Sequence, residues 1–462
     1  MTVRWSNWLG NQSALPLAIV APRNVAGVVD AVQAAVRKGQ RLRVLSGGYC
    51  WSPLVPVDGV LLSMEHLNQI GPIDTARHQL TVQPGASLRE VVLAAAAAGL
   101  SVQSPAMFLG LTIGGLIATG SHGTGRNAST LGDSVVAFEL VAPDGQVIRH
   151  NEPGSALWRA AMTNLGALGV LTSVTLQCEL LYNVLEEHRK VHFLETASLI
   201  PTLLRSHEFV SVFWSPAGSI ANFKLGNRSD LPAAKLKGRI HPTLRDRSTV
   251  VTGRLLPRLA EKVPALTELM AVAMSEGIGT GTQVVREPDF SHYQQIYPPC
   301  ISSEFAIPIE HAADAWAWVV QRLMQYWRSG IRPVNLVVHA RFGCASRTLL
   351  ASCAGRATCH LEVLCLEANP HRDLFAHDFD EKMRNDFEGR PHWGKDIANP
   401  WRAAQTHGAN MEAFLEIRQQ FDPRQSFLNA YLRDDIFGLG RRVARRGPAM
   451  GALDQWHPLF NI

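Results

Sequence analysis

Two glycine-rich segments carry the residue types best suited to hold an anion against the backbone. One is residues 46–52, Ser-Gly-Gly-Tyr-Cys-Trp-Ser, and the other is residues 114–125, Gly-Gly-Leu-Ile-Ala-Thr-Gly-Ser-His-Gly-Thr-Gly. Because glycine lacks a Cβ, several main-chain N–H groups can approach one pyrophosphate closely. Neither segment has the order G-x-G-x-x-G or G-x-x-x-x-G-K-[ST], so the two commonest nucleotide motifs are absent. Each segment alone could be a plain turn, but two in one half of the chain favour a large anionic ligand.

The elements around these segments follow an α+β pattern. Up to residue 180, strands are predicted near 41–45, 59–64, 79–83, 135–141 and 171–176, helices over 25–38 and 91–98, and a hairpin turn at 143–146. Beyond residue 180, strands are predicted at 209–214, 303–307, 336–342 and 360–366, with an amphipathic helix over 312–328. The second half therefore reads as a sheet with covering helices, and residues 389–432 as a return to the ligand.

Composition limits the class of protein. A chain of 462 residues with 46% hydrophobic residues is too long for one ordinary core, so two domains are expected. The net charge is +5, but no basic stripe interleaved with aromatic residues predicts nucleic-acid binding. The arginines at 441, 442, 445 and 446 read as a solvated tail. Seven cysteines without paired spacing indicate a reducing compartment, the cytoplasm, and neither a zinc pattern nor a membrane span is expected.

Five motifs together resemble the sugar-lactone and alditol oxidase branch of the vanillyl-alcohol oxidase flavoprotein superfamily, which has an FAD-binding domain of the PCMH type. They occupy residues 45–52, 111–125, 165–175, 390–395 and 422–429, and the resemblance is weakest between 191 and 302. It implies a two-subdomain FAD-binding domain over 1–182, an α/β cap domain with a mainly antiparallel sheet over 183–385, and a C-terminal segment, 386–462, that returns to the first domain. It also implies hydride transfer from a small alcohol substrate to FAD, with oxygen or another electron acceptor completing the cycle.

The resemblance also implies which residues meet the cofactor. Those expected to bind FAD are Gly47, Gly48, Tyr49, Cys50, Trp51, Gly114, Gly115, Gly120, Ser121, His122, Gly125, Gly169, Val170 and His392. In many relatives a histidine at the position of Tyr49 bonds covalently to the flavin. Tyr49 cannot form that link, so non-covalent FAD is expected, with Cys50 as an alternative attachment point or an ordinary small buried residue.

The catalytic residues implied are His339, Arg341, Lys395 and Glu362. Residues 339 and 341 share one face of a predicted strand, where the family has Glu-x-Arg, so a histidine replaces the glutamate. His339 could accept the substrate hydroxyl proton, or it could be a core histidine. Glu362, beside His360 on the next strand, could restore the carboxylate or could face solvent. Lys395 could stabilise negative charge, or could pair with Asp396 on the surface.

Three other functions were weighed, of which two stay open at this point. The first is a dehydrogenase of a large glycosylated or lipid-linked sugar, for which several tryptophans, or merely core packing, would account. The second is a catalytically inactive flavin-binding protein, motivated by the two departures from the family pattern. The third, a serine hydrolase, is excluded because Thr119 breaks the G-x-S-x-G pattern of a nucleophile elbow.

Overall fold

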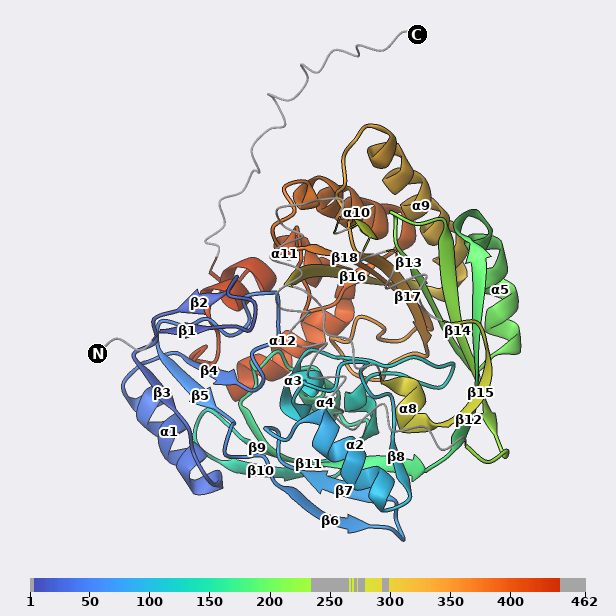
Figure 1. Cartoon of the computed structure of the whole chain (residues 1–462). Helices are drawn as coiled ribbons and strands as arrows, with labels where there is room; N and C mark the ends of the chain where they lie inside the picture. Colours follow the sequence, from blue (N-terminus) through green and yellow to red (C-terminus); the bar gives the residue numbers. More distant parts are fainter. Residues whose placement is uncertain are drawn as a thin grey trace, which may run out of the picture.

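The computed structural model describes residues 4–233, 279–292 and 299–440, together with four single residues at 266, 268, 269 and 272. Most of the Pro-, Lys- and Arg-containing stretch at 231–258 and the arginine cluster near the C-terminus lie outside the described residues. Figure 1 shows a lower part built mainly from the first half of the chain and an upper right part built from the second half, with the C-terminal helices between them. In the part of the chain that is described, no helix is long and apolar enough to cross a bilayer.

A small parallel sheet forms the first layer. Its order is β3 (Ala18–Val20), β5 (Val60–Ser63) and β4 (Leu42–Leu45), preceded in the chain by the short pair β1 (Trp5–Ser6) and β2 (Ser13–Ala14). Helix α1 (Val25–Arg37) starts where the Asn24 side chain accepts a hydrogen bond from the N–H of Gly27. The buried face of α1 packs on Leu42 and Leu62, which holds β4 in place just before the first glycine-rich loop.

A larger antiparallel sheet lies beside it (Figure 1). Its order is β10 (Val147–His150), β9 (Val135–Val141), β11 (Val170–Leu180), β7 (Gln79–Val82) and β6 (Ile70–Asp74), and β8 (Leu100–Val102) pairs with the end of β11. The predicted turn at 143–146 does connect a hairpin, β9 to β10. Helix α2 (Leu88–Ala97) begins with a capping box between Ser87 and Glu90. The short helices α3 (Ile113–Ala118) and α4 (Ala156–Ala161) complete this half.

The second half forms one eight-stranded antiparallel sheet. Its order is β15 (Gly281–Arg286), β12 (Asn183–His192), β14 (Ile220–Ser229), β13 (Phe209–Trp214), β17 (Val337–Gly343), β18 (Thr358–Leu366), β16 (Cys300–Pro308) and β19 (Arg390–Pro391). Helices α5 (Thr196–Ser206), α9 (Ala312–Arg328) and α10 (Arg372–Phe387) cover its outer face, where Trp316 and Phe379 are fully buried. Helix α8 (Glu287–Ser291) follows β15.

The C-terminal segment packs back against the first half of the chain. Helices α11 (Pro400–Ala403) and α12 (Ala409–Phe421) lead to a last turn at Tyr431–Ile436. Phe414 and Leu428 share one buried cluster with Trp158 and Leu116. The segment between α10 and α11 lies between the first glycine-rich loop and the eight-stranded sheet: β19 pairs with β16, and the carbonyl of Gly394 accepts a hydrogen bond from the N–H of Trp51.

Candidate active site

The inner face of the eight-stranded sheet carries a row of four side chains from adjacent strands. The register places Phe213 opposite His339, His339 opposite Glu362, and Glu362 opposite Glu304, across β13, β17, β18 and β16. All four are buried. Directly opposite residues in antiparallel strands have neighbouring Cβ atoms, so the row brings together residues up to 149 positions apart in sequence. The predicted sharing of one face by His339 and Arg341 agrees with this register.

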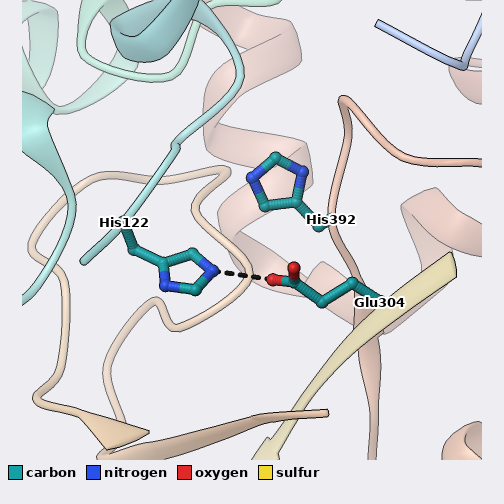
Figure 2. Close-up of side chains that lie close together, drawn as sticks. All are labelled: His122, Glu304 and His392. Atoms are coloured by element: carbon teal, nitrogen blue, oxygen red, sulfur yellow. Dashed lines mark hydrogen bonds and ion pairs between the residues drawn. The ribbon is translucent and has the colours of Figure 1, made fainter. Parts of the chain in front are cut away.

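Glu304 lies at the centre of the buried network. Its Oε1 is 2.7 Å from Nε2 of His122, which belongs to the second glycine-rich loop. The dashed line in Figure 2 marks this contact. Its Oε2 accepts a 2.7 Å hydrogen bond from Nη2 of Arg341, and Nζ of Lys395 lies 3.7 Å away. His360 stacks on His122 with ring centroids 3.4 Å apart. One carboxylate therefore joins a cofactor loop, the sheet and the C-terminal segment.

Glu362 is the second carboxylate of the same network, and it contacts four other side chains. It accepts hydrogen bonds from Lys395 and from Oγ of Ser302, the latter at 2.5 Å. Its Oε2 lies 3.3 Å from Nη2 of Arg341 and 3.5 Å from Nδ1 of His339. Lys395 thus pairs with Glu362, and the alternatives of a solvent-facing Glu362 and of a surface pair between Lys395 and Asp396 do not hold.

The electrostatics of the network favour ionised carboxylates beside neutral histidines. Burial opposes ionisation of Glu304, but the charge of Arg341 and the hydrogen bond with His122 outweigh it and hold its pKa well below the usual range. Burial likewise opposes ionisation of Glu362, but Lys395 first and then His339 and Arg341 keep its pKa low. Desolvation lowers the pKa of His339 to about 4, more than its hydrogen bond to Glu362 raises it.

The other three histidines of the network, His122, His360 and His392, are also neutral near pH 7, because burial lowers the pKa of each. Desolvation lowers the pKa of His392 to about 4 and that of His360 to about 3. Two carboxylates and two basic side chains, Arg341 and Lys395, then remain as the charged groups. Their charges cancel, so the buried network carries no net charge.

His122, Glu304 and His392 have the side-chain types of a metal site. Figure 2 shows them converging, and their ligand atoms lie within 4.8 Å of one another. Their surroundings argue against a cation there. The guanidinium of Arg341 already occupies one oxygen of Glu304 and the ammonium of Lys395 lies close to it. These two side chains supply the positive charge that a metal ion would bring.

The first glycine-rich loop fits a pyrophosphate. Within the described residues, no backbone N–H group from Gly47 to Cys50 donates a hydrogen bond. Four successive donors without partners are the arrangement that binds an anion through the main chain. Gly48 has φ +68°, a conformation that side chains disfavour.

The two glycine-rich loops touch each other. Oγ of Ser46 lies 2.7 Å from Oγ1 of Thr112. A Cβ on Gly114 would approach Cβ of Pro84 to 2.7 Å and Oγ of Ser46 to 3.2 Å, so glycine is needed for this close contact. The residues present therefore fit FAD: the loops would hold its phosphates, and the rest of the cofactor would lead toward His122 and the buried network.

The remaining residues expected at the cofactor lie along these loops and at the start of β11. Gly120 and Gly125 have φ +65° and +143°, and the N–H of Gly125 donates to the carbonyl of Phe342 on β17. Ser121 bonds Thr119. Gly169, at φ +138°, has no room for a Cβ because the carbonyl oxygen of Val141 would lie 2.4 Å from it. Tyr49, Trp51 and Gly115 are half-buried, and Val170 is buried at the first position of β11.

Sequence reasoning missed Glu304 and Phe213 as site residues. Residues 303–307 were expected to form a strand, and an acidic residue next to Phe-Ala-Ile in that strand was a usable signal. Phe213 stacks on His339 with ring centroids 4.0 Å apart and an interplanar angle of 14°. Cys50 is a poor nucleophile here, because burial raises the pKa of its thiol to about 11.

Comparisons with known proteins agree with this geometry. Residues 16–151 match the family model described as FAD binding domain. The chain is 27% identical to L-gulono-1,4-lactone dehydrogenase of Mycobacterium tuberculosis, over 94% of this chain and 99% of that one. It is 24% identical to L-gulonolactone oxidase of Mus musculus (93% and 97%) and 26% identical to alditol oxidase of a Streptomyces species (95% and 100%).

Solved structures show the same fold. A solvent-stable cholesterol oxidase superposes with a TM-score of 0.78 at 18% identity, covering 95% of this chain and 98% of that one. Phl p 4, a grass pollen allergen with glucose dehydrogenase activity, has a TM-score of 0.64 at 14% identity and 89% coverage of both chains. Residues 174–435, more than half of the chain, match the model described as D-arabinono-1,4-lactone oxidase. The chain therefore belongs to the D-arabinono-1,4-lactone oxidase family and is an FAD-dependent oxidoreductase that acts on CH–OH groups.

Proposed function

We propose that the chain oxidises a CH–OH group of an uncharged sugar lactone or alditol, with His339 as the group that accepts the hydroxyl proton. The row of Phe213, His339, Glu362 and Glu304 beside the cofactor loops is the observation that carries this proposal. The substrate class is supported by the names of the relatives. It is also supported by the balanced charge of the network, where Arg341 and Lys395 already pair with carboxylates.

Two neighbouring side chains fix the orientation and the tautomer of the His339 ring. Phe213 stacks on its ring, and Glu362 lies 3.5 Å from Nδ1, which favours the tautomer with hydrogen on Nδ1. Nε2 has no hydrogen-bond partner among the described residues, although it is buried. An unprotonated ring nitrogen is thus left for a substrate hydroxyl.

The reaction separates a hydride from a proton. When bound, FAD supplies the acceptor for the hydride that leaves the substrate carbon. The hydroxyl proton passes to Nε2 of His339, and the C–O single bond becomes a carbonyl. Arg341 and Lys395 stabilise negative charge that develops on the substrate oxygen as the proton leaves. Glu362 and Glu304 hold these two cations in position.

FAD is proposed to be non-covalently bound. Tyr49 stands where many relatives carry the linking histidine, and the raised pKa of Cys50 leaves too little thiolate for a thioether. Without a histidyl link a weaker oxidant is expected. Either oxygen or another electron acceptor would reoxidise the reduced flavin.

The cellular setting and the domain division are proposals as well. The seven cysteines are all unpaired, which supports a reducing compartment, the cytoplasm. The change from the first two sheets to the eight-stranded sheet supports domains at 1–182 and 183–385, and the packing of α12 against the first half supports a returning segment at 386–462. No nucleic-acid partner is proposed.

The test is the visible spectrum of the purified protein, followed by acid precipitation and anaerobic mixing with a panel of alcohols. Flavin absorbance that acid releases into the supernatant, and bleaching by neutral lactones or alditols, are the expected results. Colour in the pellet would overturn the non-covalent assignment. Bleaching only by a glycosylated or lipid-linked sugar would overturn the small-substrate assignment, and bleaching by no alcohol would leave a flavin-binding protein without this activity.

A further inference from the structure

The first glycine-rich loop is held by a segment that lies outside the matched FAD-binding region, which begins at residue 16. Residues 7–12 run alongside the loop. The N–H of Trp8 donates to the carbonyl of Gly48 at 3.2 Å, and Nδ2 of Asn7 donates to the carbonyl of Cys50 at 3.0 Å. Nε2 of Gln12 donates to the carbonyl of Trp51 at 2.9 Å. Three carbonyls of the loop therefore accept hydrogen bonds from residues 7–12.

One of these contacts leaves a donor of the loop available to a ligand, and the others fix the loop on the far side of that donor. A backbone carbonyl and the N–H of the next residue belong to one planar peptide group and point in opposite directions. Fixing the carbonyls of Gly48 and Cys50 toward residues 7–12 turns the following N–H groups, those of Tyr49 and Trp51, away from that segment. The N–H of Trp51 meets the carbonyl of Gly394, whereas that of Tyr49 has no protein partner in the described chain.

Asn7 anchors the loop through the carbonyl of Cys50. It is buried, and its Oδ1 accepts hydrogen bonds from the N–H groups of Gly10 and Gln12 at 2.9 and 3.2 Å. Its Nδ2 also donates to Asn11 at 2.7 Å. One side chain therefore closes the turn of residues 7–12 with its oxygen and holds the loop with its nitrogen.

Trp8 adds an aromatic surface at the same place. Its ring lies 6.1 Å from that of Tyr49 at 29°, and 5.7 Å from that of Trp51 in an edge-on arrangement. Phe108 meets Tyr49 at 5.4 Å. Trp8 is 39% and Phe108 37% exposed, although both join an aromatic cluster. Exposed rings beside a set of anion-binding donors suit a ligand that combines a pyrophosphate with an aromatic ring.

We propose that residues 7–12 are part of the FAD site: Asn7 and Gln12 are positioning residues for the pyrophosphate loop, and Trp8 contacts the ring system of a flavin that has no covalent link. The inference rests on FAD as the cofactor. Its two parts act on different portions of the ligand. Asn7 and Gln12 affect the phosphates, so they should matter for any ligand with a pyrophosphate, whereas Trp8 should matter only when the flavin ring is present.

The experiment compares dissociation constants of the full-length apoprotein for FAD and for ADP-ribose, which has the pyrophosphate but no flavin. Gln12→Leu removes one donor without adding charge, and Asn7→Asp removes another while keeping the turn. Both should weaken FAD and ADP-ribose alike, by about tenfold. Trp8→Ala should weaken FAD by about tenfold and leave ADP-ribose within about twofold, and Trp8→Phe should recover most of the loss.

Leu15→Ala is the matched control, because Leu15 is exposed and lies just beyond the segment. It should bind both ligands as the unchanged protein does. Unchanged FAD affinity in Gln12→Leu and Asn7→Asp would overturn the positioning role. Equal weakening of both ligands by Trp8→Ala would assign that residue to loop structure alone. If the unchanged protein binds ADP-ribose but not FAD, the cofactor assignment itself fails, an outcome distinct from failure of this inference.

Discussion

The glycine-rich loops and the buried network bind charge by different means. Between Gly47 and Cys50 the donors are backbone N–H groups, whose direction is set by chain conformation. In the network of Glu304, Glu362, Arg341 and Lys395, full charges on side chains balance one another away from water. The loops should therefore be sensitive to added volume and tolerant of charge changes elsewhere, whereas the network should be sensitive to the loss of any one charge.

Removal of the Arg341 charge should give the largest effect. Arg341→Met leaves Glu304 and Glu362 buried without their shared guanidinium, and an uncompensated buried charge costs about 3–5 kcal/mol. Chemical denaturation should show that loss in the free energy of unfolding, together with loss of flavin reduction by substrate. The matched control is Arg149→Met, which removes an arginine whose side chain is 81% exposed and should change neither quantity. Equal stability of the two variants would mean that the network is not desolvated.

Acid should weaken the network before it affects the loops. The pKa of His339 falls from 6.5 to about 4 on folding, so between these values the unfolded chain binds the proton and the folded chain does not. Stability is therefore complete above pH 6.5 and is lost as pH falls toward 4, by about 3 kcal/mol for this residue. Denaturation curves across this range measure the slope, and His339→Gln should reduce it by the share of this residue, while the shares of His360 and His392 remain. A slope unchanged in that variant would place the titration elsewhere, for example at His360 or His392.

A methyl group in the loop contact should have a smaller and more specific effect. Gly114→Ala brings a Cβ to 2.7 Å from that of Pro84 and should separate the two loops. FAD affinity should fall about tenfold, while the rate of flavin reduction at saturating FAD stays close to that of the unchanged protein. Gly279→Ala, at a position with no atom within 4 Å, is the control. A slower reduction rate at full FAD occupancy would show that loops and network are not independent.

Much of the fold could be predicted from the sequence, because the apolar spacing that marks a helix or strand lies within the segment that forms it. Helix α9 and strands β9 and β13 were predicted with the bounds observed, since their apolar spacing and flanking turns lie within the segment itself. Strands β12, β14 and β15 were missed. β12 reads Asn-Val-Leu-Glu-Glu-His-Arg-Lys-Val-His and is only partly buried, so its charged residues conceal the alternation.

The site could be predicted only in part for a different reason. Spacing within one strand places His339 with Arg341, and His360 with Glu362. It cannot show that Glu304 lies opposite Glu362, because that depends on how β16 and β18 pair across the sheet. Nor can it show that Lys395 reaches Glu362 from a separate segment. The sequence therefore predicted His339 and Glu362 as separate parts of the row, and it did not predict Glu304.

The most direct test of the account is the rate of flavin reduction in His339→Ala, measured anaerobically at saturating FAD and substrate. We expect a fall of about 10²–10³-fold with unchanged FAD affinity, because the substrate hydroxyl loses its proton acceptor while the loops remain intact. The rate in His339→Gln should fall similarly, since an amide keeps the size of the side chain but takes no proton. A rate equal to that of the unchanged protein would contradict the account and make His339 a packing residue of the sheet.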